Sequence, residues 1–264
     1  MNLNQIGQMP FVCFILRFLS FLRFTLEDYF HSKRILIEVF LTFAFLFLLF
    51  NNKQPFLTGQ FFGSVGAFSL ALTLFTVSSV LSQGDQPAGY LLLIRRLDRT
   101  SYLLGLYFCA LLLILLSFCI ICAATFFLKP PSDLNFANFI VRTIPLVLNV
   151  GLVGAFLLLL TPMVLSTGWR LLLLSLLALA FSSSFVSGYF LQTLPKDFVQ
   201  ILSGMQALLS YPLLPILRGF ALMLEQRTGT PEFTVLITQG ALLAIILLTA
   251  IYSFRQRELT FLNE

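Results

Sequence analysis

Long apolar runs separated by short polar breaks dominate this chain. The runs show no strict alternation of apolar and polar positions. Most reach about 20 residues, the length at which a helix crosses a bilayer core of about 30 Å. The pattern therefore predicts six membrane-spanning helices, which cover residues 35–50, 60–82, 102–128, 139–165, 170–190 and 233–254.

Turn-forming and capping residues mark the breaks between these runs. Residues 51–55 and 166–169 are predicted to form turns. Pro145 and Pro162 are predicted to kink the fourth span, because proline cannot donate a backbone hydrogen bond. Thr100 or Ser101 is expected to cap the third span.

The first 34 residues show a different pattern. Between residues 10 and 30, polar side chains fall on one helical arc, and apolar side chains fill the rest. The polar set is Arg17, Ser20, Glu27, Asp28 and His31. This pattern is typical of a helix that lies in the membrane interface. An additional span stays open as the alternative, although Arg17 and Arg23 inside it would be costly to bury in lipid.

Composition supports a membrane protein throughout. Hydrophobic residues make up 58% of the 264 positions, charged residues make up 10%, and the mean hydropathy is +0.95. A soluble domain carries about 25% charged residues. Since lipid offers backbone groups no hydrogen-bond partners, the long runs select helices. We therefore expect an all-α membrane protein with an N-terminal helix in residues 1–34 and one six-span domain in residues 35–264.

The net charge of +5 is spread over the ends of the apolar runs rather than gathered on one basic face. This distribution argues against nucleic-acid binding and instead sets membrane orientation. With both termini in the cytoplasm, the cytoplasmic set is Arg17, Arg23, Lys33, Arg34, Arg95, Arg96, Arg99, Arg170, Arg255 and Arg257. The outer set is Lys53, Lys129, Arg142, Lys196, Arg218 and Arg227. Glu38, one turn after Arg34, is expected to pair with it at the cytoplasmic boundary.

The polar break between the second and third runs carries the most informative segment, residues 83–101. Gly84 and Pro87 end the second span, after which the apolar residues of a short helix share one face between basic residues. That face comprises Tyr90, Leu93, Ile94 and Leu97. Such a helix offers a surface that another protein can bind. An ordinary basic loop that only sets topology is the alternative, and the pattern leaves both open.

This order of features resembles the ABC-2-type permeases, the membrane subunits of ATP-binding-cassette exporters. The matching residues are Leu91-Leu92, Leu97-Asp98-Arg99 and Tyr102-Leu103-Leu104-Gly105. Where acidic residues are frequent in the family, this chain has Gln83, Asp85 and Gln86, of which only Asp85 is acidic. It also has Arg96 in place of proline and Leu106 in place of lysine.

The resemblance implies a permease in a bacterial inner membrane, with a re-entrant outer segment at residues 191–231. It implies a second permease copy or a homologous partner, and separate cytoplasmic ATPase subunits that use the ATP. Residues 83–101 would then form a coupling segment that contacts those ATPases. The contact residues would be Asp85, Tyr90, Arg95, Arg96, Leu97, Asp98 and Arg99.

Three stripes of small or hydroxyl-bearing residues are candidates for packing or for a substrate path. The small-residue stripes are Gly59, Gly63 and Ala67, and Ala180, Ser184 and Gly188. They suit either a dimer contact or packing within the chain. The hydroxyl stripe is Ser69, Thr73, Thr76 and Ser79, which would border a path or bond to its own helix.

The sequence motifs that are missing argue against several classes of function. The chain has no GxxxxGK[ST] phosphate loop, so we expect no ATPase site of its own and no cofactor. His31 is the single histidine, and no ionisable residue lies in the middle of a predicted span, Arg142 being the nearest. Cys13, Cys109, Cys119 and Cys122 are expected to be small packing residues. A secondary transporter or channel, and a membrane scaffold, remain the alternative functions.

Overall fold

The structure, a computed structural model, describes residues 10–51, 57–84, 98–133, 135–181, 214–224 and 230–256. These residues are helical apart from short connections, and no strand occurs among them. The helices are α2 (Pro10–His31), α3 (Arg34–Asn51), α4 (Thr58–Gly84), α6 (Arg99–Leu128), α7 (Phe136–Leu159), α8 (Thr167–Phe181), α11 (Leu214–Leu224) and α12 (Thr230–Gln256).

Five of the described helices, α3, α4, α6, α7 and α12, are long and apolar enough to cross a membrane. The chain is therefore an integral multi-pass membrane protein, as its hydropathy predicts. These five helices coincide with predicted spans one to four and six. The fifth predicted span begins in α8, and its residues 182–190 lie outside the described part of the chain.

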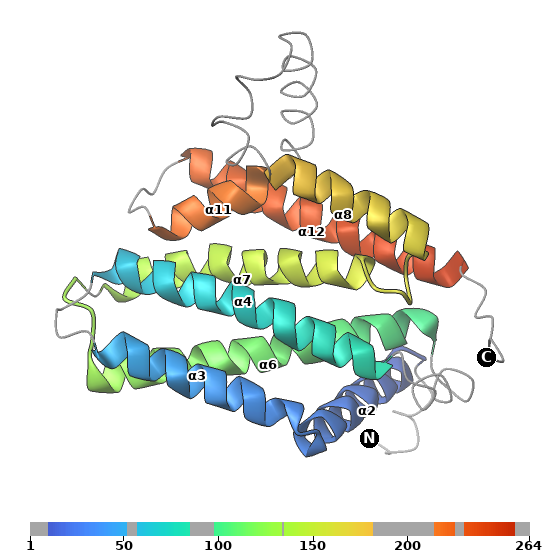
Figure 1. The fold of residues 1–264 in the computed structure, drawn as a ribbon, viewed down its shortest axis with the longest axis horizontal. Helices are drawn as coiled ribbons and strands as arrows, with labels where there is room; N and C mark the ends of the chain where they lie inside the picture. Colours follow the sequence, from blue (N-terminus) through green and yellow to red (C-terminus); the bar gives the residue numbers. More distant parts are fainter. Residues whose placement is uncertain are drawn as a thin grey trace, which may run out of the picture.

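The helices run side by side along the long axis of the molecule, so their ends gather at two ends of a bundle (Figure 1). We call these the Arg34 end and the Asp133 end. The Arg34 end carries Arg34, Gly84, Arg99, Leu159, Thr167 and Gln256. The Asp133 end carries Asn51, Thr58, Leu128, Asp133 and Phe136. Residues 85–97 therefore connect two points at the Arg34 end.

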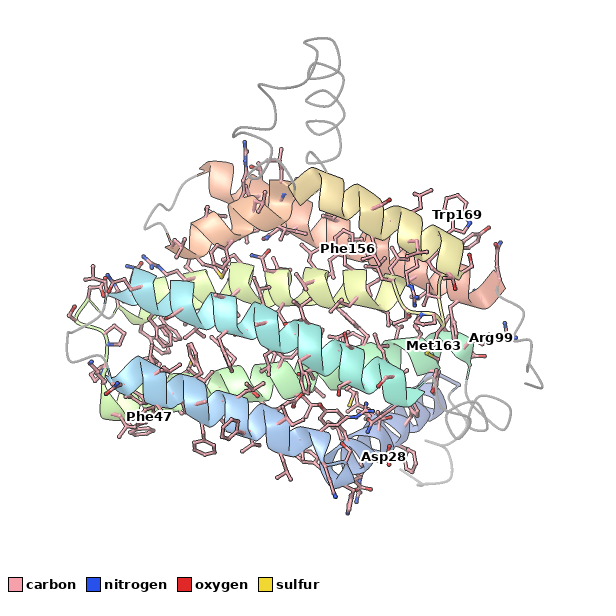
Figure 2. All side chains as sticks on the ribbon, in the orientation of Figure 1. Asp28, Phe47, Arg99, Phe156, Met163 and Trp169 are labelled. Carbon is pink, nitrogen blue, oxygen red and sulfur yellow. The ribbon has the colours of Figure 1, made fainter. Side chains whose placement is uncertain are left out.

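α4 and α7 form the centre of the bundle. α4 packs against α3, α6, α7 and α11, while α7 also packs against α11 and α12. The outer face of α3 is apolar and exposed, and Phe47 projects from it with 70% of its surface accessible (Figure 2). Apolar side chains on the outside of an apolar helix suit a surface solvated by lipid.

α2 is a separate helix that packs on α6 and α3. Its buried stripe is Phe21, Thr25 and Tyr29, which recur every four residues. Ser20, Glu27, Asp28 and His31 are exposed, and Asp28 lies at the corner where α2 meets α3 (Figure 2). The helical period predicted from the sequence is thus present. The side chain of Arg17 lies outside the described residues.

Two predicted boundaries are wrong. α7 ends at Leu159 rather than Leu165, and Pro162 lies in the turn that follows instead of kinking the helix. The Pro162 ring would clash with the carbonyl of residue 158 if the helix continued. At α6, the N-cap is Asp98 rather than Thr100 or Ser101, and its carbonyl accepts from the Tyr102 backbone N–H.

Candidate functional site

The predicted coupling segment is described only at its two ends. Asp85, Tyr90, Arg95, Arg96 and Leu97 lie outside the described residues. Asp98 is the exposed N-cap of α6, and Arg99 is the first residue of that helix. The geometry on either side of the segment, at Gly84 and at Asp98, therefore defines the site.

Tyr102 joins the two ends of this segment. Its hydroxyl donates a 2.7 Å hydrogen bond to the carbonyl of Gly84, the last residue of α4. Carbonyls in the last turn of a helix have no partner within the helix, so this bond satisfies one of them. Both residues are buried. The last turn of α4 and the first turn of α6 are thereby fastened together.

α2 is held at the same place by Phe21. The Phe21 ring lies 5.2 Å from the Tyr102 ring, centre to centre. A Cβ atom added to Gly105 would come within 2.5 Å of the Phe21 ring, so only glycine leaves room for it. Tyr102 and Gly105, which the family resemblance singled out, thus form the notch in which α2 packs.

Arg34 binds the end of α4 from the other side. Its Nη1 donates to the Ser79 carbonyl at 2.8 Å and to the Ser82 hydroxyl at 2.6 Å. The prediction that Arg34 pairs with Glu38 is wrong, because its guanidinium faces α4 instead. The intrahelical spacing suited an ion pair, but the Ser79 carbonyl and the Ser82 hydroxyl of the neighbouring α4 compete for the same donor.

Glu38 is buried, with 3% of its surface accessible, and it lies one turn after the start of α3. Its Oε1 accepts a 2.5 Å hydrogen bond from the Tyr29 hydroxyl of α2 and another from the Thr76 hydroxyl of α4. One carboxyl group therefore links three helices. Burial and the neighbouring carboxyl raise the pKa of the Tyr29 phenol, which keeps it a hydrogen-bond donor.

Arg99 connects the segment to the C-terminal end of α12. Its Nη1 donates to the carbonyl of Arg255 at 3.3 Å, and Figure 2 shows Arg99 at the Arg34 end. A cation close to the carbonyls of a helix C-terminus is favourable, because that end carries partial negative charge.

The hydroxyl stripe of α4 is buried within the chain. Thr73 donates to the carbonyl of Ser69 on its own helix at 2.6 Å, whereas Thr76 donates to Glu38 of α3. The Ser79 carbonyl accepts from Arg34. The hydroxyls of Thr73 and Thr76 therefore have partners inside the protein, and a role of the stripe in lining a path stays a prediction.

The first small-residue stripe faces α11. A Cβ atom on Gly59 would lie 3.0 Å from the Leu224 carbonyl, and one on Gly63 would lie 2.8 Å from the Leu224 side chain. Ala67 is exposed. The side chain of Ala180 and the whole of Ser184 and Gly188 lie outside the described residues.

The Asp133 end has a polar contact that the sequence did not indicate. Asp133 Oδ1 accepts from the Thr58 backbone N–H at 2.6 Å and from the Thr58 hydroxyl at 2.8 Å. It therefore caps α4 from a loop 75 residues away. The Thr58 backbone N–H holds the pKa of the Asp133 carboxyl below its usual value.

Arg142 is buried in α7 and donates to the carbonyl of Met223 near the end of α11 at 3.3 Å. The sequence placed it near the outer end of its span, and it lies in the half of α7 closer to the Asp133 end.

Cys109 and Cys122 are buried, as expected of packing residues, whereas Cys119 is exposed on α6. The side chain of Cys13 lies outside the described residues. Within the described ranges, no group of three or more His, Cys, Asp or Glu is placed to hold a metal ion.

A buried amide pair also escaped the sequence analysis. Gln239 of α12 donates to Asn149 of α7 at 2.7 Å, and both side chains are almost fully buried. A single carboxamide within each apolar run was the available signal, but hydropathy alone did not show that the two runs meet.

Several of these interhelical polar contacts lie at the Arg34 end, around the C-terminal half of α4. We call Tyr29, Arg34, Glu38, Thr76 and Tyr102 the α4 junction. Comparison with protein-family models, with curated proteins and with solved structures gave no match.

Proposed function

We propose that this chain is the membrane permease subunit of an ATP-binding-cassette exporter. In this proposal two copies, or this chain and a similar partner, enclose the substrate path. Separate ATPase subunits bind from the cytoplasm at residues 83–101. The observation that supports it best is the α4 junction, which fastens the helices on either side of that segment to one another and to α2 and α3.

Coupling of this kind requires that force on a loop reaches the spans. α4 and α6 are long single helices, so displacement of their ends tilts them along their whole length. Because Arg34 and Glu38 bind the end of α4, α3 would follow that movement. The Phe21 contact would carry it to α2.

Charge distribution supports an inward-facing Arg34 end. Described lysines and arginines close to it are Arg23, Lys33, Arg34, Arg99, Arg170 and Arg255. Lys129 and Arg142 lie toward the Asp133 end. An excess of basic residues marks the cytoplasmic side, so both termini would be cytoplasmic and α2 would lie in the inner interface. A bacterial inner membrane is part of the same proposal.

α11 supports the re-entrant segment. It is a short apolar helix of 11 residues, about 17 Å long at 1.5 Å per residue, or roughly half a bilayer. It packs against α4, α7 and α12 within the bundle rather than extending away from it. In the proposal α8 forms the first part of the fifth span.

The test uses the chain co-expressed with an ATP-binding-cassette ATPase subunit from the same organism. Leu97→Glu and Arg99→Glu place negative charge at the coupling segment, and each is expected to abolish co-purification of the ATPase. Lys33→Glu is the matched control, since Lys33 is exposed at the same end but in a different connection. Undiminished association and ATP-dependent transport in both variants would refute the coupling role.

Glu38 gives one specific observation in favour of an ion-coupled secondary transporter. It is an ionisable group buried inside a span, a position typical of proton relays. Reconstitution separates the two functions. Transport that needs the ATPase and persists when the proton gradient is dissipated supports the exporter, and the reverse result supports the secondary transporter.

A further inference from the structure

Asn149 and Gln239 meet deep in the bundle, away from the α4 junction. Asn149 lies near the middle of α7, and Gln239 lies in the first half of α12. Their accessible surfaces are 1% and 0%. Gln239 Nε2 donates to Asn149 Oδ1 at 2.7 Å, which is the contact between the two amides.

This contact uses only half of each amide. Asn149 Nδ2 and Gln239 Oε1 have no hydrogen-bond partner among the described residues. If both amide groups were rotated so that their oxygen and nitrogen atoms exchanged places, Asn149 would be the donor and Gln239 the acceptor. One donor and one acceptor would still lack a partner. A buried polar atom without a partner is costly, and more so in a lipid-embedded bundle. The pair therefore presents a matched donor and acceptor to a third group.

α11 closes the pair from one side. A Cβ atom on Gly219 would overlap Gln239 Nε2 and lie 3.1 Å from Asn149 Oδ1. Gly219 is buried, so the backbone of α11 lies directly against the amides. No room remains there for even a methyl group on α11, so α11 shields this side of the amide pair.

We propose that Asn149 and Gln239 form a binding site for a hydroxyl oxygen. A hydroxyl both accepts from Asn149 Nδ2 and donates to Gln239 Oε1. An ionised carboxylate only accepts and an ammonium only donates, and neither amide carries a charge that would offset their burial. The hydroxyl belongs either to water or to an alcohol group of a molecule inside the bundle.

The experiment uses the full chain in lipid nanodiscs with 15N-labelled Asn and Gln side chains. Solid-state NMR measures magnetisation transfer from water to the Asn149 NH₂ group. The same spectra are recorded with n-hexanol and with n-hexane, probes that differ in the hydroxyl. Asn149→Leu and Gln239→Met identify the two signals. If Gln239→Met does not fold, Gln239→Asn is used instead, and the Gln239 signal is identified by its change of position. Asn138, exposed on α7, is the reference amide.

Transfer from water to Asn149 with no response to hexanol supports the site with water as its occupant. A shift of both amide signals with hexanol but not hexane, lost in the Gln239 variant, supports the site with an alcohol as its occupant. Neither transfer from water nor a hexanol shift at Asn149, while Asn138 exchanges with water, would overturn the proposal.

Discussion

The Tyr102 hydroxyl binds the Gly84 carbonyl across the gap between α4 and α6, 18 residues apart in sequence. It joins Gly84, at the start of the predicted coupling segment, to Tyr102, the residue directly after that segment. Any displacement of that segment therefore acts on two spans that are already bonded at their ends.

Replacing Tyr102 with phenylalanine removes this bond and leaves a buried helix-end carbonyl without its donor. We expect Tyr102→Phe to lower the free energy of unfolding by about 1–2 kcal/mol. Denaturant titration in detergent, followed by circular dichroism, measures the change. Tyr252→Phe is the control, because the Tyr252 hydroxyl is exposed and accepts only from Gln256. Equal stability of the two variants would contradict the assigned role.

The two donors to Glu38 are expected to depend on each other. Tyr29→Phe and Thr76→Val each remove one donor to the buried Glu38 Oε1. Each should destabilise the protein by about 1–3 kcal/mol. The double variant should differ from the sum, because the bonds share one acceptor. Thr249→Val, which removes an exposed hydroxyl from α12, should change stability little. Strict additivity would show that the two hydroxyls do not share Glu38.

Asp133 is expected to make stability pH-dependent. Its folded-state pKa lies below the unfolded value near 3.8. Its contribution is therefore complete above that pH and is lost as pH falls through the folded-state pKa. Asp133→Asn should lower stability near neutral pH by about 1 kcal/mol, the usual worth of a helix cap, and this difference should shrink in acid. Unfolding titrations over about pH 2–7 measure it.

The control for the Asp133 prediction is Asp28→Asn, which makes the same substitution at an exposed position on α2. A difference between Asp133→Asn and the unsubstituted chain that stays constant down to about pH 2 would contradict the cap.

Three glycine-to-alanine substitutions should have different effects on the free energy of unfolding. Gly59→Ala places Cβ against the Leu224 backbone carbonyl, which cannot move without shifting α11, so we expect destabilisation. Gly63→Ala meets only the end of the Leu224 side chain and should be close to neutral. Gly240→Ala meets nothing within 4 Å and should stabilise by up to about 1 kcal/mol through helix propensity. Thermal unfolding ranks the three, and a stabilising Gly59→Ala would refute the close contact with α11.

Local pattern predicted much of this architecture. The apolar runs located α3, α4, α6, α7 and α12 because the length needed to cross lipid is a property of each run alone. Proline and charge predicted breaks, but their exact placement failed at Pro162 and at Asp98. In both cases competing boundary signals lay within a few residues of each other.

The side-chain partners were beyond the sequence. Arg34 and Glu38 have the spacing of an ion pair, yet each binds α4, because that helix brings the Ser79 carbonyl and the hydroxyls of Ser82 and Thr76 within reach. Asn149 and Gln239 lie 90 residues apart, and nothing local indicates that they meet.

Hydropathy summed along single runs is enough to predict that this chain is helical, lies in a membrane and crosses it several times. The pairing of its polar groups depends instead on how the helices pack, because a buried donor or acceptor takes whichever partner the packing of several helices brings within reach.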